Sequence, residues 1–220
     1  VAGIDPTTPA LEFPVFADCA SCDVTADVII DFSHPSALNG ILDFAKKTGT
    51  PAVICTTGLN DSQINLIKKA SEKIPVFFSA NMSLGVNLVC ELAKKAANVL
   101  GDTFDIEIIE MHHNQKIDAP SGTALMIADS IKEELDSNVK YEYDRHSKRE
   151  KRTKNEIGIH AVRGGTITGE HQVIFAGHDE IISISHSARS KELFATGGIN
   201  AALFICGKPA GFYNMTDMLK

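Results

Sequence analysis

Hydrophobic and polar positions follow a regular order in the first eighty residues. Short apolar runs are typical of buried strands that end in polar turns: "DVIIDF" at 27–32, "PAVICTTG" at 51–58 and "PVFFSAN" at 75–81. Between them, the apolar residues of 35–49 and 61–73 recur with helical spacing. Strands that alternate with helices in this way predict right-handed crossovers and a parallel sheet.

The pattern changes after a long predicted helix at 83–101. Strand-like runs follow, with glycine-rich turns between them and one long helix near 122–136; the runs are 104–111, 156–162, 171–177 and 180–188. This order favours a mixed or antiparallel sheet. We therefore expect an α/β protein with two domains, one formed by 1–82 and 191–220, the other an α+β domain at 83–190.

Composition narrows the classes of function. The 220 residues are 44% apolar, which is enough for a substantial core, and the formal net charge is −7 with a pI near 5.6. An acidic chain is a poor candidate for a general nucleic-acid or membrane-surface binder. No apolar run has the length of a membrane span and no signal segment opens the chain, so a cytoplasmic location follows by default. Five cysteines, an odd number, predict reduced thiols.

One basic segment, 145–154, holds six Arg or Lys in ten positions. Like charges in a block usually repel one another, so the simplest interpretation is a solvated, mobile loop. The alternative is an electrostatic funnel for an anionic substrate or cofactor.

Candidate chemistry is concentrated in "IEMHHNQKIDAPSGTA" at 109–124. A predicted strand ends at Met111 and delivers His112, His113 and Lys116 into the following loop. These side chains can donate protons or carry positive charge near neutral pH.

A predicted helix begins directly after that loop. Ser121 is placed as its N-cap or first residue, and Gly122 permits close approach to the backbone. The free N–H groups, together with the hydroxyls of Ser121 and Thr123, form a receptor for a carboxylate or phosphate. The cationic loop and the helix start would then face the same anion.

Two alternatives stay open for this region. A metal site is the first, but adjacent histidines on a strand point to opposite faces, and no HxH or HExxH spacing is present. A purely structural role is the second, because histidine is also a common surface residue. We favour a substrate site without a metal.

The sequence from 110 to 124 resembles a family signature. It matches E-x-H-H-x-x-K-x-D-A-P-S-G-T-A at every specified position, which is typical of the 4-hydroxy-tetrahydrodipicolinate reductases, also called dihydrodipicolinate reductases. The resemblance extends to "DFSHPSA", "TTGL", "SLGVN", "VRGGTITGEHQVIFAG" and the terminal "GFYNMTDML".

This resemblance implies a reaction in lysine and diaminopimelate biosynthesis. A nicotinamide cofactor would reduce a cyclic, unsaturated dicarboxylate, with loss of the 4-hydroxyl as water. By analogy, His112 is the general acid, and Lys116 supports the proton transfer and neutralises a substrate carboxylate. His113 and the segment 121–123 would hold carboxylate oxygens. A homotetramer built through the sheet of the second domain is also implied.

The resemblance also implies a Rossmann-like first domain that binds NADH or NADPH. Its candidate contacts are Asp5, Cys55, Thr56, Thr57, Gly58, Ala80, Asn81 and Ser83. Asp5 matches the acidic residue that binds the adenosine ribose, and Pro6 follows it where NADPH-preferring members tend to have a basic residue, so we expect a leaning toward NADH. Cys55 replaces a family glycine and is expected to crowd the cofactor.

The family's glycine-rich pyrophosphate turn has no counterpart in the sequence. Residues 1–5 would correspond to the family's second strand, and the chain starts without Met, so we expect a truncated reductase. One alternative is a dicarboxylate-binding or inactive homologue that cannot hold a dinucleotide. Another is a nicotinamide-dependent reductase that acts on a different dicarboxylate.

Overall fold

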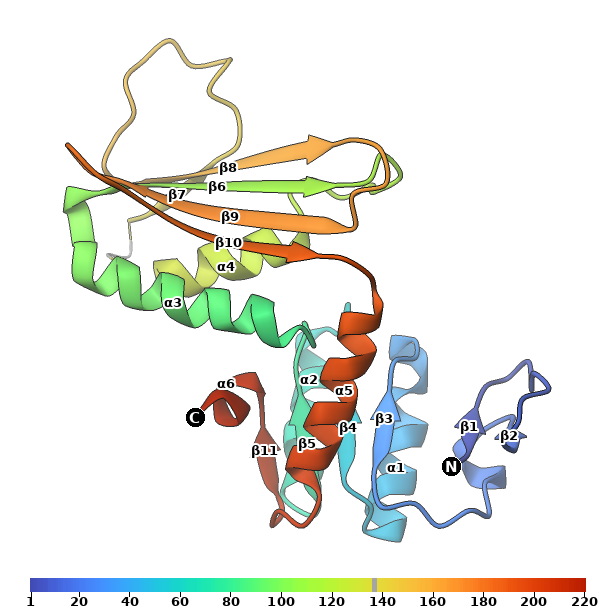
Figure 1. Cartoon of the computed structure of the whole chain (residues 1–220). Coiled ribbons are helices and arrows are strands. Elements are labelled where there is room, and N and C mark those ends of the chain that lie inside the picture. The colour runs from blue at the N-terminus through green and yellow to red at the C-terminus, as the bar shows by residue number, and fades with distance from the viewer. Residues whose placement is uncertain (136–137) are drawn as a thin grey trace. The chain divides into compact units, whose positions relative to one another are not determined.

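The computed structural model describes residues 1–135 and 138–220, and these form two compact units (Figure 1). Unit 1 comprises Val1–Met82 and Phe194–Lys220, and unit 2 comprises Ser83–Leu193. The second boundary lies three residues after the expected one, inside the first turn of helix α5 (Glu192–Ile205).

Unit 1 contains a four-stranded, wholly parallel sheet in the order β11-β5-β4-β3, which confirms the predicted sheet type. Its strands are β3 (Ile29–Asp31), β4 (Ala52–Ile54), β5 (Pro75–Phe78) and β11 (Gly211–Tyr213). The crossover helices are α1 (Leu38–Thr48) and α2 (Asp61–Ser71), and α6 (Met215–Leu219) ends the chain. Strand β11 and helix α6 lie in a segment for which the sequence analysis predicted no element.

Alternate residues of these strands face two different hydrophobic layers. Ile54 packs with α1 and α2 on one side, whereas Val53 and Phe77 pack with α5 on the other. All three side chains are fully buried. This alternation explains why the strands read as continuous apolar runs rather than as alternating ones.

The first residues of the chain form a separate two-stranded sheet. Strand β1 (Gly3–Ile4) pairs in parallel with β2 (Val15–Phe16), and a 3-10 turn, η1 (Cys19–Ser21), follows. Residues 1–5, which were expected to correspond to the family's second strand, pair here with β2 and not with the four-stranded sheet. Their backbone N–H groups bond to Pro14 and Phe16, a segment close by in sequence.

Unit 2 is built on a five-stranded sheet in the order β10-β9-β6-β8-β7. Its strands are β6 (Asp105–His112), β7 (Lys140–Glu142), β8 (Glu156–Arg163), β9 (Gly169–Ala176) and β10 (Ile181–Ala188). The pairs β6–β8 and β7–β8 are parallel, and the pairs β6–β9 and β9–β10 are antiparallel. The predicted mixed sheet is thus confirmed.

Two helices, α3 (Leu84–Leu100) and α4 (Gly122–Lys132), lie against one face of this sheet (Figure 1). Helix α4 ends at Lys132, and the expected end at position 136 lies outside the described residues. Strand β6 alternates strictly between intermediate and buried residues along its length. Glu110 and His112 therefore share the buried face with the apolar core.

The opposite face of β6 carries a second Glu–His–Arg group. Glu107 accepts hydrogen bonds from Arg152 Nε at 3.0 Å, and its Oε2 lies 2.8 Å from His160 Nε2. Arg152 also donates to Asp105 Oδ1 at 3.0 Å and to the carbonyl of Ile106 at 3.0 Å. The arginine therefore ties the basic segment to the sheet.

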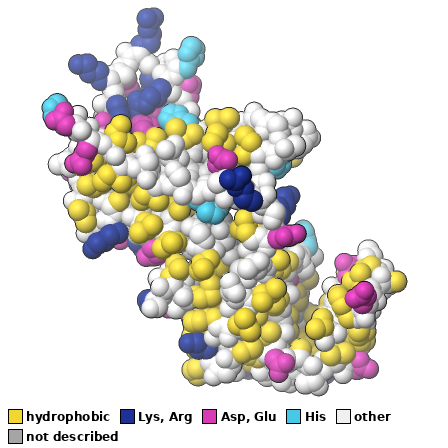
Figure 2. Space-filling view, viewed as in Figure 1, with side chains coloured by type: hydrophobic (Ala, Val, Ile, Leu, Met, Phe, Trp, Pro, Cys, Tyr) yellow, Lys and Arg dark blue, Asp and Glu magenta, His cyan; other side chains and the backbone are white. Residues whose placement is uncertain are grey.

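This changes the interpretation of the segment 145–154. Basic side chains gather over the loop between β7 and β8 (Figure 2). Arg145 pairs with Glu156, Lys148 with Glu142, and Lys154 with Asp105. Eight of its ten residues are exposed, as expected of a solvated loop, but four of its six cations have acidic partners on the sheet.

None of the helices in the described part of the chain is both long and apolar enough to cross a membrane. The five cysteines are all unpaired thiols.

Candidate active site

The site is organised around two neighbours on the buried face of β6. Glu110 is completely buried and His112 is only 9% exposed. Residues two apart on a strand point to the same side, which brings the Glu110 carboxylate to 2.6 Å from His112 Nδ1. A distance this short is typical of a hydrogen bond with a charged partner.

The carboxylate of Glu110 is surrounded by donors from three other positions in unit 2. Arg163, the last residue of β8, donates from Nη1 to Oε2 at 2.8 Å and from Nη2 to Oε1 at 2.7 Å. The backbone N–H of Ser121 donates to Oε1 at 2.9 Å. Burial opposes ionisation, but the bonds from Arg163, His112 and Ser121 prevail and lower the pKa of Glu110.

A second histidine, His171 on β9, completes this group. Glu110 and His171 are paired across β6 and β9, and the His171 ring lies edge-on to the His112 ring at 5.2 Å between centroids. His171 Nε2 lies 3.1 Å from Ser121 Oγ. Burial, together with the nearby charge of His112, lowers the pKa of His171 to about 4, so this ring is neutral at pH 7.

The other nitrogen of His112 lies on the open side of the group. In the described part of the chain, Nε2 makes no hydrogen bond, and Gly169 lies against it. A Cβ built on Gly169 would be 3.0 Å from Nε2. Glycine at this position therefore preserves the space next to the nitrogen that can exchange a proton.

Helix α4 begins as the sequence predicts. Ser121 is the N-cap, and its Oγ accepts from the backbone N–H of Ala124 at 3.2 Å. Gly122 is the first helical residue, and a Cβ built there meets no atom within 4 Å. No described atom would contact a side chain at position 122. The open space there lets a ligand approach the helix start closely.

The loop between β6 and α4 carries the predicted cation. Lys116 Nζ lies 2.8 Å from Asp118 Oδ1, and this bond lowers the pKa of the Asp118 carboxyl. The Lys116 backbone N–H donates to the carbonyl of His113, whose side chain is half-buried. The six predicted substrate-side residues therefore lie in the end of β6, the loop and the start of α4, with His112 as the last residue of β6 and not in the loop, where it was expected.

The predicted cofactor residues of unit 1 follow β4 and β5. Thr57 and Gly58 are exposed at the end of β4, where Gly58 adopts a φ of 74° with open space around it. Thr56 is buried, and its hydroxyl donates to Asp31 Oδ2 at 2.8 Å. Asp31 also accepts from the backbone N–H of Ser33 at 2.8 Å, which ties two strand-end turns together.

Cys55 does not face outward as expected. Its thiol is 5% exposed and packs in the hydrophobic layer with Val53, Phe77 and Ala201. Burial, and then the charge of Asp31, raise the pKa of Cys55 to about 12. The predicted crowding of the cofactor by this side chain is therefore not seen in unit 1, where only the Cys55 backbone remains a candidate contact.

The remaining cofactor candidates differ in exposure. Asp5 accepts from the side chain and the backbone N–H of Thr7 at 2.6 and 2.8 Å, and these bonds lower its pKa. Ala80 is exposed and Asn81 is half-buried after β5. Ser83 belongs to unit 2, is buried, and caps helix α3 by accepting from Val86 N–H at 3.1 Å.

Sequence reasoning assigned no role to several of the residues that shape the site. Glu110 stands two residues before His112, and that spacing alone indicates a shared strand face. Arg163, Gly169 and His171 come from other strands, so only the pairing of β8 and β9 with β6 brings them in. Asp31, which belongs to the predicted strand run 27–32, was assigned no role.

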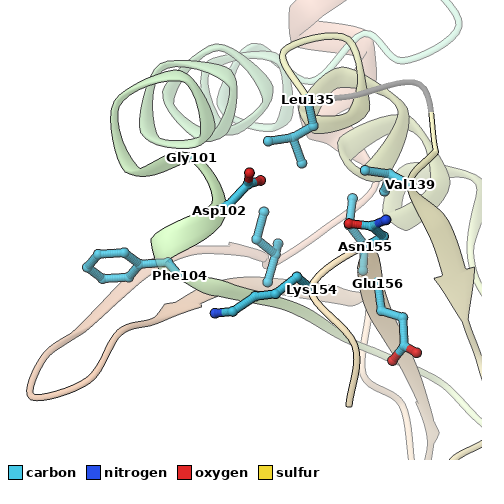
Figure 3. Close-up of a pocket in the computed structure, with 10 residues that line it drawn as sticks. Gly101, Asp102, Phe104, Leu135, Val139, Lys154, Asn155 and Glu156 are labelled. Carbon is cyan, nitrogen blue, oxygen red and sulfur yellow. The ribbon is translucent and has the colours of Figure 1, made fainter.

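Two other features do not belong to this site. The pocket in Figure 3 is lined by residues of 101–106, which follow α3, by Leu135 and Val139, and by residues 154–157, and its volume is about 10 Å³. This is room for roughly one water molecule. Within residues 1–135 and 138–220, no three His, Cys, Asp or Glu side chains are grouped to hold a metal ion.

Comparison with known proteins covers nearly the whole chain. Residues 2–82 match the family described as "Dihydrodipicolinate reductase, N-terminus", and residues 85–219 match "Dihydrodipicolinate reductase, C-terminus". The 4-hydroxy-tetrahydrodipicolinate reductase of Caldanaerobacter subterraneus subsp. tengcongensis is 53% identical over 100% of this chain and 87% of its own length. The enzyme of that name from Clostridium tetani is 51% identical over 100% of this chain and 86% of its own length.

A solved structure agrees with these matches. Dipicolinate-bound dihydrodipicolinate reductase from Paenisporosarcina sp. TG-14 aligns with a TM-score of 0.76 and 26% identity. The alignment covers 96% of this chain and 81% of that one.

Proposed function

Because the chain belongs to the dihydrodipicolinate reductase family, whose members are NAD(P)H-dependent oxidoreductases, we propose that it reduces 4-hydroxy-tetrahydrodipicolinate to tetrahydrodipicolinate in lysine and diaminopimelate biosynthesis. One observation carries the proposal: between Glu110 and Thr123, one strand, loop and helix start gather an imidazole, an ammonium group and the backbone N–H groups of a helix N-terminus. A proton donor beside an anion receptor suits a dicarboxylate that must be protonated as it is reduced.

The substrate carboxylates would be held by the loop and the start of α4. The backbone N–H groups of Gly122 and Thr123 would receive one carboxylate, and the open space beside Gly122 supports its close approach. Lys116 would exchange part of its bond with Asp118 for a substrate carboxylate, and His113 would donate to a carboxylate oxygen. The dipicolinate bound to the relative from Paenisporosarcina is a planar dicarboxylate, which supports this class of ligand.

The proton would come from His112. Its Nδ1 is held by Glu110, so Nε2 is the atom left to reach the substrate ring. Lys116 would support this transfer by neutralising negative charge near the ring. His171, with its pKa near 4, stays neutral and serves Ser121 rather than competing as an acid.

A nicotinamide cofactor would supply the hydride. The residues of unit 1 fit such a group at the ends of the parallel strands, where nucleotides bind in open α/β sheets. Thr57, Gly58, Ala80 and Asn81 would lie against it, and the ionised Asp5 would accept from the ribose hydroxyls. Cys55 and Thr56 would contribute backbone groups, and Ser83 is the remaining candidate.

Two titrations of the 220-residue chain test the proposal. Calorimetry with pyridine-2,6-dicarboxylate and separately with NADH should detect binding of both, and a turnover assay should then consume NADH only when the substrate is present. Binding of the dicarboxylate alone would favour the alternative of a homologue that cannot hold a dinucleotide. Binding of neither would overturn the assignment of the site.

The homotetramer and the cytoplasmic location implied by the family stay predictions. The sheet face of unit 2 opposite α3 and α4 supports an assembly, because Ile109 and Met111 help to line a hollow of about 260 Å³. Light scattering at several protein concentrations measures the assembly; a monomer throughout would contradict it.

A further inference from the structure

We propose that Glu110 is a positioning residue that fixes the hydrogen of His112 on Nδ1 and leaves Nε2 as the atom that donates to the substrate. The inference deepens the proposed function and rests on it for the role of His112. Glu110 does not touch the substrate in this proposal; it acts through the imidazole.

Both oxygens of the Glu110 carboxylate are surrounded by hydrogen-bond donors. Oε1 receives the Ser121 N–H and Arg163 Nη2, and Oε2 receives Arg163 Nη1 and lies against His112 Nδ1. The backbone N–H and the two guanidinium N–H groups can only donate, and an ionised carboxylate can only accept. His112 Nδ1 must therefore carry a hydrogen and donate it to Glu110.

The tautomer of the neutral ring follows from this count. With Nδ1–H bonded to Glu110, the neutral imidazole has a bare Nε2, and protonation of the ring adds the hydrogen at Nε2. Transfer to the substrate removes that same hydrogen and returns the ring to the tautomer that Glu110 holds. His112 then needs no rotation or tautomer change between one turnover and the next.

Charges on the neighbouring strands offset the negative charge of Glu110, so Glu110 acts on His112 mainly by orienting its ring. Arg163 on β8 offsets the negative charge of Glu110 by a two-point bond, and His171 on β9 is neutral. Lys116, in the loop, is paired with Asp118. The Glu110–Arg163 pair thus presents His112 with a directional acceptor and almost no net charge.

The substitution Glu110→Gln tests this directly. The single glutamine oxygen should face the two fixed donors at the Oε1 position, Ser121 N–H and Arg163 Nη2. Its amide N–H would then face His112 Nδ1, which has to become an acceptor, and the hydrogen moves to Nε2. Two-bond ¹H–¹⁵N NMR of the histidine-labelled protein should report Nδ1–H in the wild type and Nε2–H in the variant.

Kinetics provide the second readout. We expect kcat to fall at least about tenfold, while KM for the dicarboxylate changes by less than about threefold, because the carboxylate receptor is intact. A matched control is Glu142→Gln, which alters a buried carboxylate held by Lys148 and the backbone N–H of Asp144, with no histidine partner. The control should keep kcat and the His112 tautomer.

A second variant tests the proposal if Glu110→Gln does not fold. If Glu110→Gln leaves Arg163 unpaired and unfolds the protein, the double variant Glu110→Gln with Arg163→Met removes both charges, and Ser121 N–H still orients the amide. Wild-type kcat with an unchanged tautomer in either variant would overturn the proposal, as would Nε2–H in the wild type. Failure of wild-type turnover would instead count against the proposed function, because the NMR readout does not depend on activity.

Discussion

The Nε2 atom of His171 lies 3.1 Å from Oγ of Ser121, so the N-cap of α4 is bonded to a histidine from β9. Burial, and then the charge of His112, lower the pKa of His171 to about 4. The N-cap of the proposed anion receptor at the start of α4 is thus hydrogen-bonded to an uncharged histidine.

The depressed pKa of His171 predicts a loss of stability in mild acid. Between about pH 6.5 and pH 4 the unfolded chain binds a proton at His171 that the folded protein does not, so the free energy of unfolding falls as the pH drops through this window. The loss from this group is about 3 kcal/mol. Urea denaturation at a series of pH values should show that His171→Gln, which keeps a partner for Ser121, removes this part of the pH dependence. Identical pH dependence in both proteins would contradict the assignment.

Gly169→Ala should impair the chemical step. The new Cβ would lie 3.0 Å from His112 Nε2, which is closer than packed side chains normally allow, so the ring must shift by a few tenths of an ångström. We expect kcat to fall roughly tenfold, because small misplacements of a reacting group are costly. Gly164→Ala is the control, since a Cβ there meets no atom within 4 Å. Steady-state kinetics of both variants measure the effect. Equal kcat values would show that a Cβ at position 169 does not displace the His112 ring.

Gly122→Ala should separate ligand binding from stability. The space beside Gly122 is empty in the protein itself, so the melting temperature should be unchanged. If a carboxylate approaches the helix start, the methyl group should weaken binding of pyridine-2,6-dicarboxylate about tenfold, or about 1.4 kcal/mol. Calorimetry measures the affinity, with Gly40→Ala on α1 as a control that also meets no atom within 4 Å. Wild-type affinity would place the carboxylate elsewhere.

Arg152→Met should destabilise unit 2. The guanidinium donates to Asp105, Glu107 and three backbone carbonyls, and its side chain is only 17% exposed. We expect a loss of about 2–3 kcal/mol in the free energy of unfolding, because charged groups lose their partners. Arg149→Met changes an exposed arginine in the same loop and should alter the free energy of unfolding by less than about 0.5 kcal/mol. Denaturant titration compares the two; similar losses would contradict the anchoring role.

NADH should bind more tightly than NADPH. An ionised Asp5 accepts from ribose hydroxyls but repels a 2′-phosphate, and Pro6 offers no compensating charge. Titration of the chain with each dinucleotide should show weaker binding of NADPH, and Asp5→Asn should narrow the difference. A tenfold preference for NADPH would reject this expectation.

The sequence was informative wherever the signal was local. Parallel strands, crossover helices and the 110–124 signature all depend on neighbours in the chain, and Ser121, predicted at the start of a helix near 122–136, is the N-cap of α4. The partners of Glu110 were not predictable in this way, because Arg163 and His171 lie 53 and 61 residues further along the chain and are brought in by strand register. The orientation of Cys55 was missed for a similar reason: only packing against α5 turns its thiol inward.

Strand β6 has a glutamate on each of its faces, and each glutamate is bonded to a histidine and to an arginine. On one face Glu110 and His112 are buried against the core and Arg163 pairs with Glu110, whereas on the other face Glu107, His160 and Arg152 are all partly exposed. A search for active sites by residue type and distance would return both groups as equivalent. The access of water distinguishes the two groups. The Glu107 side chain is 23% exposed, whereas Glu110 is completely buried, so only the inner group holds a proton at one chosen atom without competition from water.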